Sequence, residues 1–164
     1  MTPTVYLAAH GTTRWHNNPV VPAQTVADHC AGVARFVLWL KPYPSPGLIL
    51  EALHHDDGEG VVGDIPGPAK REFPKLRDWY EYYEHIARVG MRSPTAKSLS
   101  DEERKVLRIA DWLEAITFAN YFGRPGLLER QDWKDQCWAV VNMAEELDDE
   151  IGSKVRKWIQ EITS

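Results

Sequence analysis

The sequence predicts an all-α fold, in which a single compact domain holds about six helices. Apolar residues recur at the three-and-four spacing of a helix through most of the chain. Alternating strand patterns are almost absent, and VYLAA at 5–9 is the one weak candidate for a strand. We therefore expect residues 1–164 to form one domain, which begins with an irregular arm at 1–23 that is rich in proline, glycine and asparagine.

Proline separates the first two predicted helices. An apolar stripe predicts a helix over 23–40, which ends at the Lys-Pro pair 41–42 because a residue before proline avoids helical conformation. The Ser-Pro pair 45–46 has the form of an N-cap followed by proline at the first helical position, so a second helix is expected from there to about 57. Residues 58–69 contain four glycines and two prolines and are expected to form a loop.

The second half of the chain predicts four further helices. The first, over 74–89, is rich in aromatic residues, which we interpret as core or as a subunit interface. The second, over 98–121, is the longest and begins with the capping-box pattern Ser-Asp-Glu-Glu at 100–103. The last two helices are expected over 125–147 and 148–162.

Charge and cysteine content narrow the classes of partner. The net charge of −5 and the pI of about 5.7 argue against a broad nucleic-acid-binding face, which needs an excess of lysine and arginine. Cys30 and Cys137 stand far apart and in no metal spacing, which is typical of reduced thiols in a cytosolic protein. No signal peptide and no membrane span are recognised in the sequence. We therefore expect a cytoplasmic protein that binds neither nucleic acid nor membrane.

The end of the second predicted helix carries a dense group of polar residues, HHDD at 54–57. Helical phase turns His55 and Asp56 toward the core and turns His54 and Asp57 outward. A merely acidic helix C-terminus is a poor explanation, because the helix dipole disfavours carboxylates there. A buried aspartate is also costly unless it is paired or binds a metal. A metal ion beside His55 and Asp56 would supply the missing positive charge.

Two further polar residues stand on the apolar stripes of other helices. His29 lies among the valines of the first helix, and Asp111 interrupts an apolar row of the 98–121 helix. A single histidine on an apolar face is usually an ordinary core residue, so the hypothesis depends on the whole set. Together with His55 and Asp56, these residues form a mixed imidazole and carboxylate set. Such a set suits Zn²⁺, Mn²⁺, Fe²⁺, Co²⁺ or Ni²⁺ better than Ca²⁺.

The order of these residues resembles a known enzyme family. HDDGEGVVGDIPGPAK at 55–70 is similar to the signature H-D-x-x-E-x-x-x-x-D-x-P-x-P-x-K of bacterial 5′-deoxynucleotidases, a branch of the HD-domain metal-dependent phosphohydrolases. The Arg14-Trp15 pair, fifteen residues before His29, and IADWLEA at 109–115 also resemble that branch. The resemblance implies a compact, helical HD domain that hydrolyses nucleotides with a bound metal.

The resemblance assigns roles to the acidic residues after the second helix. Glu59 and Asp64 match the catalytic acids of the family, in the loop directly after two proposed ligands. Glu59 is the candidate to take a proton from the attacking water, and Asp64 either protonates the leaving oxygen or holds a sugar hydroxyl. The alternative for both acids is simple loop capping. The implied metal ligands are His29, His55, Asp56 and Asp111.

The resemblance also implies residues that bind the substrate. Arg14 would grip phosphate, and Lys70 would add a second cation after Pro68 of the same Pro-x-Lys motif. Trp15 would stack on the sugar or base, although a tryptophan is more often simply part of a core. Arg108, one turn before the last proposed metal ligand, is the candidate for a third phosphate cation; its alternative is a solvated helix face. Further candidate cations are Lys105 and Arg71.

Two kinds of relative compete as the guide to the reaction. The chain is compact, with 26 positions from His29 to His55 and 55 from Asp56 to Asp111, which favours the small phage dATP triphosphohydrolases of the 2-aminoadenine pathway. A triphosphate also needs more cations than a monophosphate. The first alternative is a 5′-deoxynucleotidase that acts on deoxynucleoside monophosphates. The second alternative is a non-catalytic HD module that senses a nucleotide or a metal.

The resemblance further implies the partners of the protein. We expect a small-molecule deoxynucleotide as the ligand and a divalent transition metal (Zn, Co, Mn, Fe or Ni) as the cofactor, with Mg²⁺ as an additional ion on the phosphates. We expect a homo-oligomer, either a dimer or a hexamer. Its expected location is the cytoplasm of a bacterium or of a phage-infected host cell.

Overall fold

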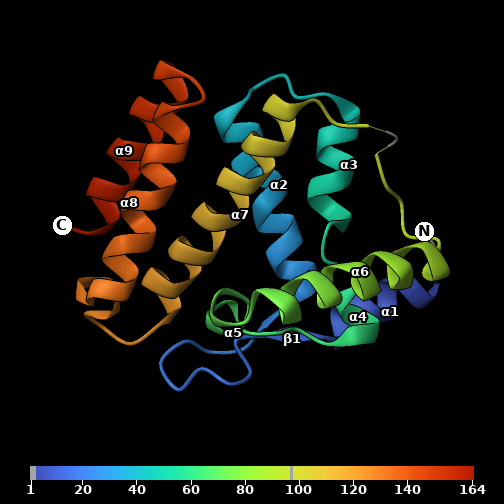
Figure 1. The fold of residues 1–164 in the computed structure, drawn as a ribbon. Coiled ribbons are helices and arrows are strands. Elements are labelled where there is room, and N and C mark those ends of the chain that lie inside the picture. Colours follow the sequence, from blue (N-terminus) through green and yellow to red (C-terminus); the bar gives the residue numbers. More distant parts are fainter. Residues whose placement is uncertain (1–2, 97) are drawn as a thin grey trace.

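The computed structural model describes residues 3–96 and 98–164, and these residues are mostly helical (Figure 1). All six predicted helices are present, so the predicted all-α fold is confirmed. Within the described ranges, no helix is both long and apolar enough to cross a membrane. The six helices are α2 (Val26–Leu40), α3 (Pro46–His54), α6 (Pro74–Met91), α7 (Asp101–Phe122), α8 (Gln131–Glu145) and α9 (Asp149–Ile162).

Side-chain caps fix where the two central helices begin. Thr25 accepts a hydrogen bond from the backbone N–H of Asp28 at the start of α2. Ser100 and Glu103 form a reciprocal capping box at the start of α7, as the sequence predicts. Both helices begin three residues after their predicted starts. The reason is that each helix begins directly after its N-cap residue, whose side chain satisfies the free backbone N–H groups of the first turn.

The main core lies around α2 and α7, which pack side by side in the middle of the molecule (Figure 1). Val33 and Val37 of α2 belong to one buried cluster with Ile109 and Leu113 of α7. Helix α3 packs against α2, and the α8–α9 hairpin packs against α7 on the side away from α3. Full burial of one such side chain contributes about 1.5–3 kcal/mol. This layer therefore fixes the relative positions of the two central helices.

The N-terminal segment differs from the predicted irregular arm. Residues Pro3–Gly11 form helix α1, so the weak strand predicted at 5–9 is wrong. Helix α1 packs against α4 (Glu59–Val62), where a Cβ on Gly60 would lie 2.2 Å from the Cβ of Ala8. Close packing on a distant segment thus stabilises α1, and the sequence of α1 alone does not reveal that contact.

The rest of the arm is a loop that a short strand ladder closes. Among the described residues, β1 (Thr13–Arg14) and β2 (Gln24–Thr25) pair antiparallel, with Arg14 opposite Gln24. A short 3-10 helix (Leu127–Glu129) between α7 and α8 contacts both helices. Because β2 runs directly into α2, the ladder holds Arg14 close to the start of that helix.

The glycine-rich segment 58–69 is also more regular than predicted. It contains α4 and the start of α5 (Gly67–Glu72), so the described residues form nine α-helices rather than about six. Gly63 follows α4 with a φ of 79°, which residues other than glycine rarely adopt. Helices this short depend on packing rather than on intrinsic propensity. The glycine and proline content predicted a loop because composition does not report the packing that stabilises these two short helices.

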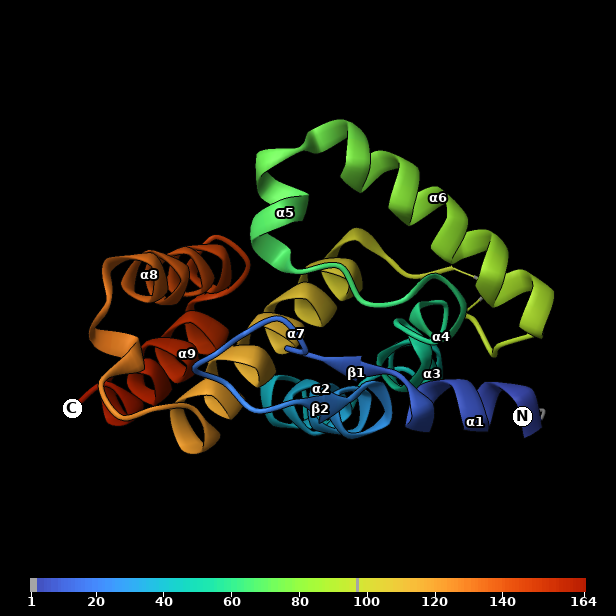
Figure 2. The same ribbon diagram turned by 90° about the horizontal axis from the view of Figure 1, so that it is seen from below.

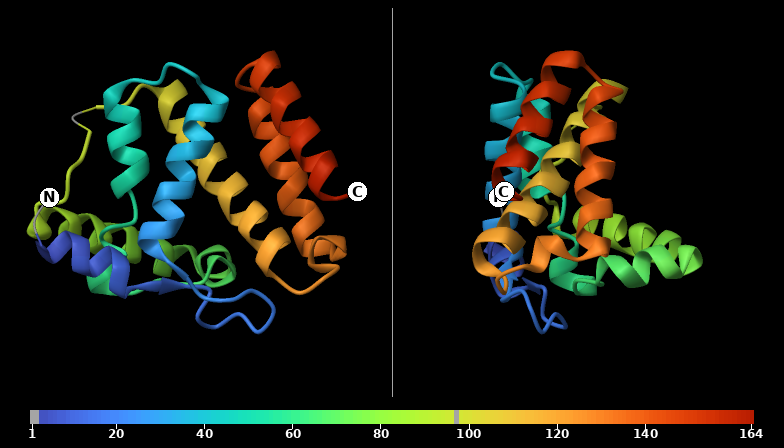
Figure 3. Two further views of the ribbon diagram at one scale, coloured as in Figure 1. Left: turned by 180° about the vertical axis from the view of Figure 1, so that it is seen from behind. Right: turned by 90° about the vertical axis from the view of Figure 1, so that its left-hand side faces the viewer.

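Helix α6 lies across one end of the bundle and projects from it together with α5 (Figures 2 and 3). Tyr80 and Met91 are its buried residues among those described. The neighbouring aromatic side chains point largely to solvent, and Trp79 is 59% and Tyr82 60% exposed. The interpretation of this aromatic group as core is therefore wrong for all but Tyr80.

Candidate metal centre

Four side chains predicted as metal ligands come together near the start of α2. His29 belongs to α2, His55 and Asp56 follow α3 directly, and Asp111 belongs to α7. One donor atom from each of His29, His55 and Asp111 lies within 4.8 Å of the other two. Asp56 lies beside both histidines, with carboxylate oxygens 3.5 Å from Nε2 of His29 and 3.4 Å from Nε2 of His55. Three separate elements thus direct imidazole and carboxylate groups to one place.

This donor set has the spacing that a bound cation needs. Two ligands that are each about 2.0–2.1 Å from a zinc ion lie roughly 3–4 Å apart, and Nε2 of His29 is 3.1 Å from Oδ1 of Asp111. The Nε2 atoms of His29 and His55 are buried and make no hydrogen bond of good geometry within the described residues. A divalent ion between these nitrogens and the carboxylates would satisfy both. The residues therefore fit a transition-metal centre with nitrogen and oxygen donors.

The charges of the cluster are strongly coupled. Burial disfavours the imidazolium form of His55, but Asp56 and other neighbours outweigh burial and raise the pKa of His55 to about 10. Burial likewise opposes ionisation of Asp56 and Asp111, but the two histidines and Arg14 lower the pKa of both carboxyl groups. Metal ligands must be deprotonated, so a metal ion would displace the imidazolium protons on binding.

Arg14 extends from β1 into the same cluster. Its side chain is mostly buried, and Nη1 lies 3.8 Å from Oε2 of Glu114. Burial opposes the guanidinium charge, but four surrounding carboxylates outweigh it and raise the pKa of Arg14 further. Nη1 makes no hydrogen bond to the described residues, so the group has a donor suited to a phosphate oxygen. The four carboxylates are those of Asp56, Asp111, Glu59 and Glu114.

Glu59 opens the short helix α4, and its carboxyl group is buried near the cluster. Burial, Asp56 and Asp64 raise the pKa of Glu59 to about 9, so this group holds a proton at neutral pH when no metal ion is bound. Nζ of Lys70 lies 3.7 Å from Oε1 of Glu59 and 4.5 Å from the ring centre of Tyr80. A cation at the cluster would oppose the shift, as Lys70 does, and would leave Glu59 able to accept a proton.

Asp64 lies where the N-terminal arm meets the glycine-rich segment. Its carboxylate is 3.7 Å from Nδ1 of His16, in the loop after β1. The phenol of Tyr80 donates a hydrogen bond to the backbone carbonyl of Gly63, which fixes the residue directly before Asp64. Asp64 is also near enough to Glu59 to raise its pKa. The two proposed catalytic acids are therefore neighbours in space.

Trp15 has a left-handed backbone conformation with a φ of 64°, which residues other than glycine seldom adopt. Its ring lies 6.0 Å from the ring of Trp133 on α8, between centres, and packs at the margin of the main core. Its buried Nε1 has no hydrogen-bond partner within the described part of the chain. The ring of Trp15 thus packs as part of the core, which was the alternative to stacking on the sugar or base of a substrate. The left-handed backbone of Trp15, directly after Arg14, is the observation that favours a role of Trp15 in the site, because such conformations are common at functional sites.

The remaining candidate substrate residues lie on exposed surfaces. Pro68 is exposed in the first turn of α5, and Arg71 is exposed on the same helix. Arg108 is exposed on α7, one turn before Asp111. Of the proposed phosphate cations, Arg14 and Lys70 are thus the two with contacts to the carboxylates of the site.

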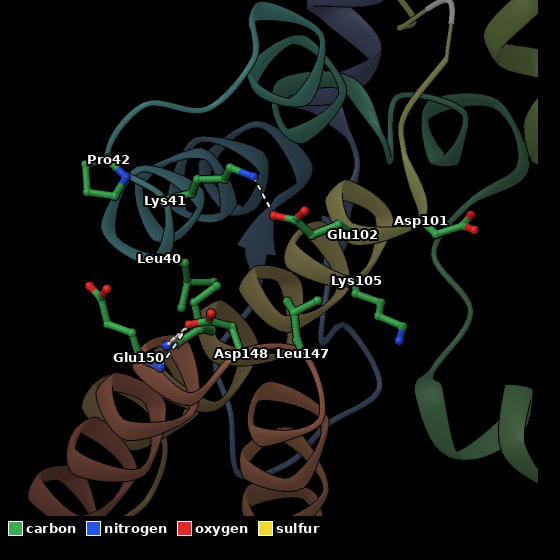
Figure 4. Close-up of a pocket in the computed structure, with 10 residues that line it drawn as sticks. Leu40, Lys41, Pro42, Asp101, Glu102, Lys105, Leu147, Asp148 and Glu150 are labelled. Carbon is green, nitrogen blue, oxygen red and sulfur yellow. Dashed lines mark hydrogen bonds and ion pairs between the residues drawn. The ribbon is translucent and has the colours of Figure 1, made fainter.

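A separate cavity of about 540 Å³ lies at the start of α7, beside the turn between α8 and α9 (Figure 4). Lys105 lines this cavity, and Lys41 pairs there with Glu102 at 2.6 Å. Asp148 and Glu150 add further negative charge to the wall. The position of Lys105 among these carboxylates does not support its predicted role as a phosphate cation at the metal cluster.

His54 and Asp57 are buried, so the prediction that they face outward is wrong. Nδ1 of His54 is 2.8 Å from Oδ2 of Asp57, and the hydroxyl of Ser93 donates to the same oxygen at 2.6 Å. Helix α3 ends at His54, so helical phase does not extend to Asp57, and the segment after α6 covers this side of the turn. The resulting network encloses the two residues between them, His55 and Asp56.

The sequence did not identify Glu114 as a functional residue. Glu114 is buried one turn after Asp111 and accepts hydrogen bonds from Nδ1 of His29 and from Nε2 of Gln24, the latter at 2.7 Å. The sequence does contain a signal for Glu114, because this residue shares the apolar stripe of Asp111 and a buried glutamate needs hydrogen-bond or charge partners. The identity of those partners depends on how α7 packs against α2 and the strand ladder.

No family model matches the sequence, and a search of curated proteins finds no match. The fold, by contrast, is shared with a solved HD phosphohydrolase. One similar structure is the cyanophage S-2L HD phosphohydrolase DatZ, bound to dA and one catalytic Zn²⁺ ion. It has a TM-score of 0.71 and 20% identity, and the match covers 99% of this chain and 97% of that one. A protein from Pyrococcus horikoshii OT3 has a TM-score of 0.62 and 20% identity, over 96% of this chain and 94% of that one.

Proposed function

We propose that this protein is a metal-dependent phosphohydrolase of deoxynucleotides and that its substrate is dATP. The observation that carries the proposal is the convergence of two histidines and two aspartates on a fold shared with a phosphohydrolase that binds dA and a catalytic Zn²⁺ ion. Arg14 adds a phosphate donor at the same place, because its Nη1 makes no hydrogen bond to the described residues. The proposed metal ligands are His29, His55, Asp56 and Asp111.

The proposed reaction is the hydrolysis of dATP to deoxyadenosine and tripolyphosphate. A water oxygen bonds to the α-phosphorus, and the bond from that phosphorus to O5′ of deoxyadenosine breaks. A bound divalent metal would supply Lewis-acid stabilisation and a more acidic water. Glu59 takes the proton of the attacking water and passes it on to the leaving O5′. Asp64 either relays this proton or accepts a hydrogen bond from a sugar hydroxyl. Arg14 and Lys70 bind phosphate oxygens and hold them for in-line attack.

A second candidate is a 5′-deoxynucleotidase activity on deoxynucleoside monophosphates. The observation in its favour is that two cations, Arg14 and Lys70, contact the carboxylates of the site, whereas Arg71 and Arg108 are exposed. Two cations suffice for a monophosphate. The dA ligand of the similar phage enzyme supports an adenine deoxynucleotide as the substrate in either case. The choice of the triphosphate rests on the compact sequence, which resembles the small phage dATP triphosphohydrolases.

A panel of substrates separates these proposals. The protein is incubated with Co²⁺, Mn²⁺ or Zn²⁺ and with deoxy- and ribonucleoside mono-, di- and triphosphates, and the products are identified by chromatography. We expect deoxyadenosine and tripolyphosphate from dATP, and no turnover by Asp56→Ala, which lacks one proposed ligand. Turnover of monophosphates alone would replace the lead proposal with the second. Metal binding without any turnover would indicate a sensor.

We also propose a homo-oligomer that acts in the cytoplasm of a bacterium or of a phage-infected cell. Support comes from the apolar stripe on the projecting helix α6. The exposed parts of four aromatic side chains present roughly 400 Å², comparable to the largest patch on a typical monomer. A second copy that packed on α6 would cover this surface. Trp79, Tyr82 and Tyr83 belong to α6, on the same face as the exposed Ile86, and the fourth aromatic residue, Phe73, directly precedes the helix.

A further inference from the structure

We propose that Glu114 is a positioning residue, which aims His29 at the metal and holds Arg14 beside it. The inference deepens the proposed function and rests on the metal centre described above. The alternative is that Glu114 only stabilises the packing of α7. The contacts, the available space and the chemistry of the imidazole ring favour the positioning role.

The carboxylate of Glu114 joins three residues from three elements. Oε2 accepts a hydrogen bond from Nδ1 of His29 on α2 and lies 3.8 Å from Nη1 of Arg14 on β1. Oε1 accepts a hydrogen bond from Nε2 of Gln24 at 2.7 Å. Gln24 is in turn the ladder partner of Arg14. One buried side chain thus fixes a proposed metal ligand and both strands of the ladder that carries the proposed phosphate donor.

The hydrogen bond from His29 determines which ring nitrogen faces the metal. An ionised carboxylate can only accept, so Nδ1 of His29 carries the proton of this hydrogen bond, and in the neutral ring that would bind a metal Nε2 is the unprotonated nitrogen. Nε2 is the atom that lies 3.1 Å from Asp111 and 3.5 Å from Asp56. A carboxylate behind a ligating histidine fixes its tautomer and orientation and raises its basicity. His29 is 0% exposed, so bulk water does not reach its ring.

Helix α2 has a gap that admits Glu114. A Cβ on Gly32 would lie 2.6 Å from Cγ and 2.9 Å from Oε1 of Glu114. A larger residue at this position would therefore require the side chain of Glu114 or helix α2 to shift. A glycine inside a helix costs about 1 kcal/mol relative to alanine. The space required by Glu114 explains why α2 has glycine here in spite of that cost.

The test measures metal affinity and does not depend on turnover. The purified, metal-free protein is titrated with Zn²⁺ by calorimetry and with Co²⁺ by absorption, for the wild type, Glu114→Gln, Gly32→Ala and the control Glu102→Gln. The control removes an exposed glutamate from the same helix. We expect a 10- to 100-fold weaker Kd for Glu114→Gln. Gly32→Ala should weaken Kd in the same direction although alanine favours the helix, and Glu102→Gln should leave Kd unchanged.

Thermal unfolding of the metal-free proteins separates positioning from mere packing. A packing role alone predicts a lower Tm for Glu114→Gln with an unchanged Kd, and that result would overturn the inference. If Glu114→Gln does not fold, Gly32→Ala still tests the inference, because it keeps every donor and crowds the side chain of Glu114. A wild type that binds neither ion would also overturn it. Weaker Zn²⁺ binding in both variants, without hydrolysis of any nucleotide by the wild type, would contradict the proposed function alone.

Discussion

At the scale of single residues, Glu59 has the surroundings best suited to proton transfer. It is 2% exposed, and its Oε2 has no hydrogen-bond partner within the described residues. A buried carboxyl group that is protonated without a metal ion and ionised beside one can exchange a proton close to neutral pH. This environment depends on α1, which packs against the helix that Glu59 opens.

Glu59→Gln should retain metal binding and lose turnover. The amide keeps the shape of the side chain but cannot accept the proton of the attacking water, so we expect kcat to fall by about 10²–10⁴-fold. Steady-state kinetics on the best substrate of the panel, together with Zn²⁺ calorimetry, checks this expectation. Glu72→Gln, an exposed glutamate of α5, is the control and should behave as wild type. A kcat near wild type for Glu59→Gln would remove the proposed base.

Glu84 on α6 gives a prediction about pH and stability. Burial and the nearby Asp56 raise the pKa of Glu84 from 4.5 to about 7. The folded state therefore keeps a proton on Glu84 between these pH values, where the unfolded chain has lost it. Stability must fall as pH rises through this window, because the folded state binds more protons there. Glu84→Gln removes this loss and should stabilise the metal-free protein more at pH 8 than at pH 5.

The expected gain of Glu84→Gln at pH 8, relative to pH 5, is about 1–2 kcal/mol after a reduction for partial exposure. Urea unfolding of the metal-free wild type and variant at both pH values measures it. The matched control is Glu81→Gln, an exposed glutamate of the same helix. An equal effect of Glu84→Gln at both pH values would contradict the raised pKa.

At the scale of elements, the turn after α3 depends on a segment that lies far from it in the sequence. The hydroxyl of Ser93, just beyond the end of α6, donates to the buried Asp57, which also pairs with His54. The turn between His54 and Asp57 holds two proposed metal ligands. The region after α6 thus supports the site without contributing a ligand.

Ser93→Ala should destabilise the protein by about 1–3 kcal/mol, because it leaves a buried carboxylate without one of its donors. Chemical unfolding monitored by circular dichroism measures the change. Ser98→Ala, at an exposed serine of the same connection, should have an effect close to zero. Equal stability of both variants would show that the hydrogen bond from Ser93 contributes nothing.

The elements also show where prediction from the sequence succeeds. Helices α2 and α7 each bury their own stripe, so the apolar period along each chain segment predicts them. Helix α4 has four residues and buries one side chain, Glu59, so it is too short to show a repeating apolar spacing. Its stability comes from α1 and α6, which pack against it. Elements that depend on distant partners are therefore the ones that the sequence missed.

At the scale of the whole molecule, the stripe on α6 predicts how copies assemble. A double substitution Trp79→Asp and Ile86→Asp places charges in the proposed interface, so the assembly should dissociate to monomers. Light scattering coupled to gel filtration measures the mass. Trp138→Asp is the control, because Trp138 is also 59% exposed but belongs to α8. A wild type that is monomeric at every concentration would contradict the proposed oligomer.

The sequence by itself predicted the six helices α2, α3, α6, α7, α8 and α9, and the positions of His29 and Asp111 on the apolar stripes of two of them. Periodicity and capping are local, so His29 and Asp111 each stand out against the apolar stripe of their own helix, whereas His55 lies just beyond the end of α3. Only the tertiary structure decided that Glu114 meets His29, that His54 and Asp57 are buried, and that the stripe of α6 faces solvent. The physical reason is that the spacing of apolar residues along a helix reports only the direction in which each residue points from that helix. Its burial and its partners depend on which other element packs against that face.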